Sequence, residues 1–272
     1  MDKEDGRSLV AAKIIAVCNQ KGGVGKTTTA INLAACLATL EHRTLVVDMD
    51  AQSNATTGLG IDKGGLEMSM YDVITEREHD GKPITVRDIR VSVSFMNFLD
   101  IAPATEELAG VEMELVNEMA REQKLRAALA CVSDEYDYII VDSPPSLGLV
   151  TVNVLVAATS VLIPVQCEYF ALEGLAALCN TILLVQKQLN QKLVIEGALL
   201  TMYDGRLNLS REVADEVRSY FQGKVFETMI VRNVKLSEAP SVGKPIIHHD
   251  IMSLGAKNYL SLAQEIMRRN NA

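Results

Sequence analysis

Eight residues near the N-terminus have the types and the spacing that bind phosphate groups: Lys21-Gly-Gly-Val-Gly-Lys-Thr-Thr28. Glycines allow successive backbone N–H groups to point inward, and the helical segment that follows presents the positive end of its dipole to the same place. We expect Lys26 to reach the β- and γ-phosphates of a nucleotide and the Thr27 hydroxyl to ligate Mg²⁺. The rest of the phosphate cradle is expected from Gly22, Gly23, Val24, Gly25 and Thr28.

Carboxylates follow two apolar runs further along the chain. Asp48 and Asp50 end the run that starts at Thr44, and Asp142 ends the run that starts at Tyr138. Taken singly, each aspartate could be an ordinary helix cap or turn residue. In an open α/β sheet, however, ligands bind at the carboxyl ends of the strands, so three motifs in this order favour one site.

The elements that must position these residues are short apolar runs and longer segments with helical spacing. The runs, read as buried parallel strands, are 13–18, 44–48, 138–142, 160–165 and 194–200. The helical segments are 27–40, 106–132, 172–189 and 210–221. This alternation predicts an α/β fold, a doubly wound and mostly parallel sheet with helices on both faces. Residues 60–95 have the least periodicity and are expected to be irregular.

Composition favours one globular unit. The chain has 272 residues, of which 48% are hydrophobic and 22% charged, and we expect a single domain over 1–272 with a flexible N-terminus at 1–10. Neither a membrane-spanning run nor an apolar signal segment is found, which predicts a cytoplasmic protein. The net charge is −9, yet residues 200–272 carry ten basic and eight acidic residues, which is typical of a solvated face or of a local anion-binding surface.

The phosphate loop departs from the usual G-x-x-x-x-G-K-[ST] pattern, because Gln20 stands where the first glycine would be. With Lys21 at its start, it resembles the deviant Walker A motif of the group that contains ParA, MinD, arsenite-pump ATPases and nitrogenase iron protein. The resemblance implies a P-loop ATPase that uses ATP and Mg²⁺. It also implies that Lys21 reaches the phosphates of a partner subunit in an ATP-sandwiched homodimer, where it neutralises charge during phosphoryl transfer.

Other segments resemble ParA proteins in particular. Residues 47–54 are similar to V-D-x-D-P-Q-x-N, which implies that Asp50 orients the attacking water and that Asp48 lies near the water shell of the metal. Residues 139–148 are similar to I-I-D-x-P-P-S-L-G, which implies that Asp142 holds Mg²⁺ through water. Residues 231–241 resemble P-R-N-V-R-L-S-E-A-P-S, so Asn233 is expected to contact the adenine and Val231, in place of proline, to pack against it.

The ParA resemblance also predicts a DNA-binding surface. Residues 201–206 are similar to T-M-x-D-x-R, and the family pattern implies that Arg206, Arg232 and Lys235 contact phosphates of double-stranded DNA without reading its sequence. Met252 and Leu254 stand where several relatives carry Lys or Arg, which predicts a reduced DNA affinity.

The resemblance leads to one functional hypothesis and two alternatives. We expect a chromosome- or plasmid-partitioning ATPase whose ATP dimer binds DNA, associates with the nucleoid and is stimulated to hydrolyse ATP by a ParB-type centromere-binding partner. One alternative is a MinD-like membrane-associated positioning ATPase, although the amphipathic segment 259–269 fits a helix docked on the core better than a membrane anchor. The other is a ParA-like ATPase that positions a protein cargo.

Overall fold

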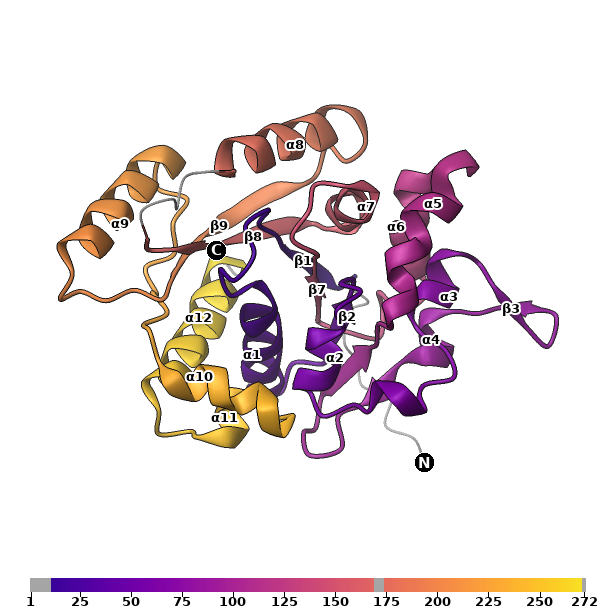
Figure 1. Ribbon diagram of the computed structural model, residues 1–272, viewed down its shortest axis with the longest axis horizontal. Coiled ribbons are helices and arrows are strands. Elements are labelled where there is room, and N and C mark those ends of the chain that lie inside the picture. The colour runs from indigo at the N-terminus through magenta and orange to yellow at the C-terminus, as the bar shows by residue number, and fades with distance from the viewer. Residues whose placement is uncertain (1–10, 169–173, 271–272) are drawn as a thin grey trace.

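A seven-stranded sheet runs through the centre of the molecule (Figure 1). The computed structural model describes residues 11–168 and 174–270. The strand order is β5-β6-β2-β7-β1-β8-β9, and all neighbours are parallel except β5 and β6. The strands are β1 (Lys13–Val17), β2 (Thr44–Asp48), β5 (Val91–Ser92), β6 (Leu99–Ala102), β7 (Tyr138–Asp142), β8 (Ser160–Gln166) and β9 (Val194–Thr201). A separate antiparallel pair joins β3 (Glu78–His79) and β4 (Lys82–Pro83). The predicted doubly wound, mostly parallel sheet is confirmed.

Helices cover both faces of this sheet, because alternate strand residues point to opposite sides. Ile15 and Val17 of β1 join one buried apolar cluster, whereas Ala16 joins the other. The first cluster includes residues of α1 (Lys26–Thr39), α2 (Asn54–Gly58), α10 (Val234–Glu238), α11 (Ile246–His249) and α12 (Leu254–Asn270). The second includes residues of α3 (Met70–Ile74), α4 (Val86–Ile89), α5 (Val111–Glu114), α6 (Lys124–Ala130), α7 (Leu149–Ala157), α8 (Leu175–Gln188) and α9 (Asn208–Phe221).

The single helix predicted over 106–132 is wrong. The segment is divided into η2 (Glu106–Gly110), α5, η3 (Leu115–Asn117), η4 (Arg121–Gln123) and α6, and further 3₁₀ turns occur at η1 (Lys63–Gly65) and η5 (Ala239–Val242). The buried apolar residues explain the break, since none lies between Leu115 and Leu125. Ala120 has a positive φ of 54°, which an α-helix does not allow. The helix-like spacing on either side therefore belongs to two separate packing sites.

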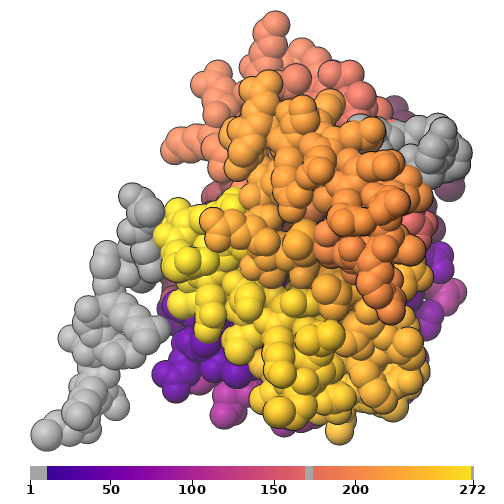
Figure 2. Space-filling model, turned by 90° about the vertical axis from the view of Figure 1, so that its left-hand side faces the viewer, coloured from indigo at the N-terminus to yellow at the C-terminus, as the bar shows by residue number. Residues whose placement is uncertain are grey.

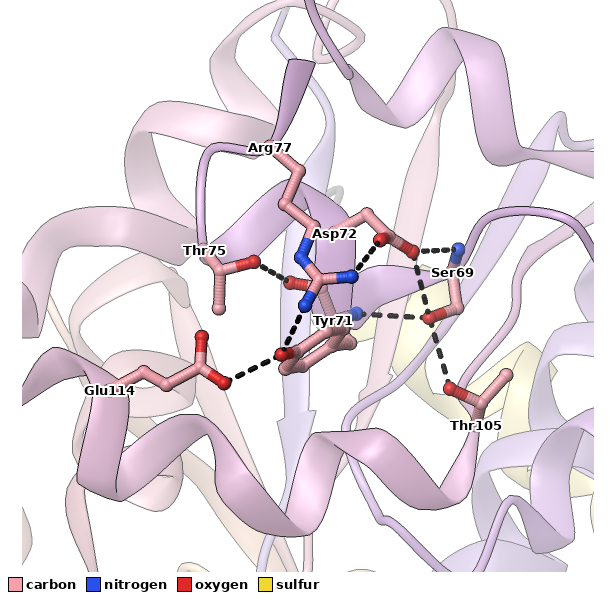
Figure 3. A network of polar contacts seen from close by, with 7 residues as sticks. All are labelled: Ser69, Tyr71, Asp72, Thr75, Arg77, Thr105 and Glu114. Carbon is pink, nitrogen blue, oxygen red and sulfur yellow. Dashed lines mark hydrogen bonds and ion pairs between the residues drawn. The ribbon is translucent and has the colours of Figure 1, made fainter. Parts of the chain in front are cut away.

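Residues 60–95, which the sequence predicts to be irregular, contain the helix α3. A polar network holds this helix in place (Figure 3). The Ser69 and Asp72 side chains form a reciprocal capping box at its start. Arg77 stacks 4.4 Å from the centre of the Tyr71 ring and donates a 2.7 Å hydrogen bond to its hydroxyl, which in turn donates to Glu114 at 2.6 Å. Helix α3 is too short to show helical periodicity in the sequence, which is why the prediction missed it.

The C-terminal helix packs on the core, as predicted. Tyr259, Leu262, Ala263 and Ile266 are buried, and α12 runs beside α1 (Figure 1). None of the helices in the described part of the chain combines the length and the apolar character that crossing a bilayer requires. The expected flexible N-terminus, residues 1–10, and the start of the helix predicted at Leu172 lie outside the described residues.

Candidate nucleotide-binding site

The phosphate loop connects β1 to α1 at the carboxyl edge of the sheet. Gly23 and Gly25 have positive φ angles of 74° and 90°, which only glycine adopts without strain. The Asn19 side chain accepts a 3.0 Å hydrogen bond from the backbone N–H of Lys21, and Thr201 of β9 donates at 2.9 Å to the carbonyl of Val24. These bonds hold the turn at the start of the fourteen-residue helix α1, where the positive end of the helix dipole favours an anion.

The two lysines of the loop have different environments. Lys26 is 7% exposed and donates a 3.1 Å hydrogen bond to the carbonyl of Lys21. Burial lowers the pKa of its ammonium group, and the carboxylates of Asp142 and Asp50 partly offset this. The Lys21 ammonium makes no hydrogen bond or ion pair with residues 11–168 or 174–270. Lys26 is therefore held inside the site, whereas the Lys21 ammonium has no polar partner in the described part of the chain.

Two fully buried carboxylates lie side by side behind the loop, because Asp48 of β2 and Asp142 of β7 are partners in the strand register. Asp48 accepts hydrogen bonds from the Asp50 N–H at 3.1 Å and from the Thr56 N–H and hydroxyl at 2.9 and 2.8 Å. Burial raises the pKa of Asp48 to about 6, despite these bonds. Asp48 thus orders the backbone that carries Asp50.

Asp142 has no such support. Both of its oxygens are buried without a hydrogen-bond partner among residues 11–168 and 174–270. Burial, followed by the negative charge of Asp48, raises its pKa well above the ordinary value, and the nearby Thr27 side chain offsets part of this shift. An orphaned buried carboxylate is costly unless a cation or ordered water completes it. The position beside Thr27 therefore fits a magnesium ion with its water shell.

Asp50 lines an open cavity of about 310 Å³ together with Gly22, Gly23, Gly25, Lys26, Thr27 and Thr28. The side chain is 8% exposed, and one oxygen accepts a 3.0 Å hydrogen bond from the Gln52 N–H. Six of the predicted phosphate-binding residues thus line one cavity with the predicted water-orienting carboxylate, whereas Lys21 and Val24 do not line it. Val24 is buried, and its carbonyl accepts the hydrogen bond from Thr201.

A second cavity, of about 200 Å³, adjoins the first at Gly25 and Thr28. Its walls are largely apolar, and Val231 and Asn233, the two residues expected to contact adenine, both line it; we refer to it as the base pocket. Thr201, Pro240 and Tyr259 also line this cavity, although the sequence predicts no role in nucleotide binding for them. For Tyr259 the sequence pattern indicates only a place on an apolar helix face. Its hydroxyl also lies 3.1 Å from that of Thr29 in α1, a contact between residues 230 positions apart that no local pattern could reveal.

Comparison with known proteins identifies the family of this site. The chain is 56% identical over 254 residues to the sporulation initiation inhibitor protein Soj of Bacillus subtilis, which covers 93% of this chain and 98% of the relative. It is 53% identical over 258 residues to the chromosome partitioning protein ParA of Myxococcus xanthus, covering 95% and 89%. The chain belongs to the ParA/Soj family of chromosome-partitioning ATPases.

Two further comparisons agree with this family. A family model described as an AAA domain matches residues 12–195. The crystal structure of cobyrinic acid a,c-diamide synthase from Mycobacterium smegmatis with a bound ATP analogue and magnesium has a TM-score of 0.83 and 33% identity, and covers 96% of both chains. The ParA/Soj phosphate loop is thus carried on a fold that is shared beyond partitioning proteins, so the fold alone does not assign the function.

The three cations that the ParA resemblance assigned to DNA binding lie on the surface. The C-terminal quarter of the chain, coloured orange to yellow, covers most of the face seen in Figure 2. The side chains of Arg206, Arg232 and Lys235 are 89%, 61% and 48% exposed. A large ligand can therefore reach all three.

Each of these cations already pairs with a carboxylate. Arg206 makes two hydrogen bonds to Asp204, at 2.9 and 2.6 Å. Arg232 pairs with Glu168 at 2.7 Å, and Lys235 with Glu238 at 2.8 Å. A DNA phosphate would have to replace these carboxylate partners. The sequence alone does not indicate that the three cations are paired.

One short segment joins this surface to the base pocket. Val231, Arg232 and Asn233 line the pocket, and the Asn233 side chain caps α10 by accepting a 2.8 Å hydrogen bond from the Lys235 N–H. Two of the three exposed cations therefore lie within two residues of the Asn233 side chain.

Proposed function

We propose that this chain works as one P-loop ATPase domain that switches between a monomer and an ATP-bound homodimer, and that the dimer holds double-stranded DNA non-specifically. The observation that carries the proposal is the segment 231–235, which lines the base pocket and bears two exposed cations. A nucleotide that orders this segment also fixes the direction of Arg232 and Lys235. Dimerisation doubles each cationic patch, which raises DNA affinity by effective concentration.

The chemistry follows from the buried groups. Lys26 leaves the Lys21 carbonyl and binds the β- and γ-phosphates of ATP, a stronger, charge-assisted partner. Thr27 and Asp142 would hold Mg²⁺, which would neutralise charge on the phosphates. Asp50 orients the water that attacks the γ-phosphate, and Asp48 fixes the backbone around it. A role for Asp48 in the water shell of the metal stays a prediction.

Lys21 makes ATP hydrolysis depend on dimerisation. Its ammonium group has no partner among the described residues, which fits a cation that acts on the phosphates of a second subunit. A charge delivered there in the transition state accelerates phosphoryl transfer. Hydrolysis is then slow in the monomer, and a ParB-type partner stimulates it by favouring the assembled dimer. The ATP state associates with the nucleoid, and hydrolysis releases it.

The oligomeric state with each nucleotide tests this switch. The Asp50→Ala variant, which accumulates ATP, should sediment as a dimer with ATP and as a monomer with ADP. Adding Lys21→Ala should restore the monomer, whereas the matched surface change Lys192→Ala should leave the dimer intact. Dimers that form regardless of nucleotide, or that persist without Lys21, would contradict the proposal.

A second candidate function is the positioning of a protein cargo or binding to a membrane, and an exposed apolar surface favours it. Ile251, Met252 and Leu254 are 63%, 74% and 60% exposed, next to the predicted DNA-binding segment. A MinD-like positioning ATPase or a ParA-like cargo-positioning ATPase could use such an apolar surface. ATP-dependent pelleting with anionic liposomes, in the absence of retention on DNA, would favour the membrane; retention on neither would favour a protein cargo.

A further inference from the structure

A third cavity, of about 250 Å³, lies between the start of α1, α2 and η5. Its polar lining includes Thr28 of α1, Asn54 and Thr57 of α2, and Lys244, which follows η5.

The three cavities meet at one residue. Thr28 lines the phosphate cavity, the base pocket and the third cavity. Pro240 is shared by the base pocket and the third cavity, and Asn54 by the phosphate and third cavities. The base pocket and the phosphate cavity share Gly25, Thr28 and Met202, so the sugar of a nucleotide that spans them would lie beside these residues. Since Thr28 also lines the third cavity, that cavity is within reach of the sugar.

Specific contacts hold the elements around this cavity close to one another. Gly60, which follows α2, and Gly243, which follows η5, both have positive φ, and a Cβ on Gly243 would lie 2.7 Å from the Gly60 Cα. Asn32 of α1 is 3% exposed; its amide donates at 2.7 Å to the Thr28 carbonyl and its oxygen accepts at 2.7 Å from the Ile246 N–H. These contacts hold the segment that carries Lys244 against the first turns of α1.

The cavity also carries a positive charge that no nearby carboxylate neutralises. Lys244 is exposed, and no carboxylate within residues 11–168 and 174–270 forms an ion pair with it. Of the described residues that line the cavity, none is acidic. An ammonium group without an anionic partner is a strong donor to a hydroxyl oxygen, and Asn54 and Thr57 can donate or accept. By contrast, Arg206, Arg232 and Lys235 are all occupied by carboxylates.

We propose that the third cavity is a ribose pocket, in which Lys244 donates a hydrogen bond to a sugar hydroxyl and makes the site selective for ribonucleotides over deoxyribonucleotides. The proposal rests on the nucleotide site proposed above, but not on dimerisation or DNA binding. The ribose is the part of ATP left after the base and the phosphates have been placed, and its 2′- and 3′-hydroxyls are the groups that distinguish it from a deoxyribose. A cell supplies both ribo- and deoxyribonucleoside triphosphates, so this contact would tie the switch to ATP.

Binding of ADP, 2′-deoxy-ADP and 3′-deoxy-ADP to the full chain, measured by calorimetry with Mg²⁺, tests the pocket without hydrolysis. The wild-type protein should bind at least one deoxy analogue about ten-fold more weakly than ADP, because one hydrogen bond to a charged group is lost. Lys244→Met should bind ADP as weakly as that analogue, and its affinity for the analogue should equal that of the wild type. This unchanged affinity also shows that the variant is folded.

Lys257→Met is the matched control, since Lys257 is an exposed lysine of α12 that lines none of the three cavities. It should keep the wild-type preference for ADP. Equal wild-type affinity for all three nucleotides, or a preference that survives Lys244→Met, would overturn the ribose pocket while leaving the nucleotide site intact. Failure of ADP itself to bind would instead contradict the proposed nucleotide site, on which the ribose pocket depends.

Discussion

The nucleotide site and the exposed C-terminal face of this protein both depend on charged side chains, but those charges are held differently. Lys26, Asp48 and Asp142 are buried at adjoining elements of the sheet edge, where burial is the main cause of their shifted pKa values. Arg206 and Lys235 are exposed and paired with carboxylates close in sequence. Buried charges act strongly and tolerate little change, whereas exposed pairs are screened by water and salt. We therefore expect large, specific effects in the first region and small, salt-dependent effects in the second.

The largest effect is expected at Lys26. Lys26→Ala removes charge-assisted contacts to two phosphates, each worth about 1.5–3 kcal/mol, so ATP affinity should fall by on the order of 100-fold or more. Calorimetric titration with ATP and Mg²⁺ measures this loss. An affinity within about three-fold of the wild type would show that the buried lysine does not bind phosphate.

Asp50→Ala should separate hydrolysis from binding. Loss of a residue that positions the reacting water typically costs about 10²–10⁴-fold in rate, while ATP affinity should change little, because Lys26 and the loop are intact. Phosphate release per dimer, compared with that of the exposed turn variant Asp62→Ala, measures the effect. Hydrolysis by Asp50→Ala at the wild-type rate would remove the assigned role.

An effect of intermediate size is expected at a buried ion pair in the C-terminal quarter of the chain. Glu265 is 2% exposed and accepts hydrogen bonds from the Glu227 and Thr228 N–H groups, each at 2.9 Å, and from Arg269 at 2.6 Å. Burial alone would raise its pKa, but these bonds and the Arg269 charge outweigh burial and lower it. Glu265→Gln should therefore cost about 2 kcal/mol in the free energy of unfolding at neutral pH.

The pH dependence of that cost has a definite sign. Because the pKa is lower in the folded protein, the carboxylate stabilises the fold above its unfolded pKa of about 4.3, and this contribution is lost as the pH falls through the folded value. Urea unfolding of wild type and Glu265→Gln at several pH values should show the difference shrinking below about pH 4. A difference that stays constant with pH would mean that the charge is not responsible.

The smallest effect is expected where an exposed pair is opened. Asp204→Asn removes the carboxylate that holds Arg206, and retention on duplex DNA in the ATP state should rise by about two-fold, with little change in stability. Glu107→Gln, which removes an exposed carboxylate outside this surface, is the control for net charge. Weaker retention of Asp204→Asn would mean that Asp204 orients Arg206 for DNA and does not compete with it.

The parts of the site that the sequence predicted are those encoded in contiguous residues. The strand-loop-helix around Lys21–Thr28 combines apolar β-residues, glycines and a helix start, so both its fold and its ligand could be inferred. The sequence also predicts that strands end at Asp48 and Asp142, because buried parallel strands are continuous apolar runs. The register that sets these two carboxylates side by side is a tertiary property.

Other features could not be predicted because they depend on contacts across the fold. Tyr259 reaches the base pocket only because α12 packs against α1. The interruption near Ala120 depends on packing against other elements, while the flanking residues suggest a continuous helix. Likewise, the carboxylate partners of Arg232 and Lys235 became visible only once the chain was folded.

The coupling between the two regions is tested most directly by retention of Asp50→Ala on non-specific duplex DNA with ATP or ADP, at two salt concentrations, with and without Arg206→Ala. The account predicts retention with ATP only, weakened by salt, and a further loss with Arg206→Ala together with a salt slope shallower by about 0.9 for each phosphate contact removed. Retention that is the same with ADP, or that is absent under every condition, would contradict a nucleotide-controlled DNA-binding switch.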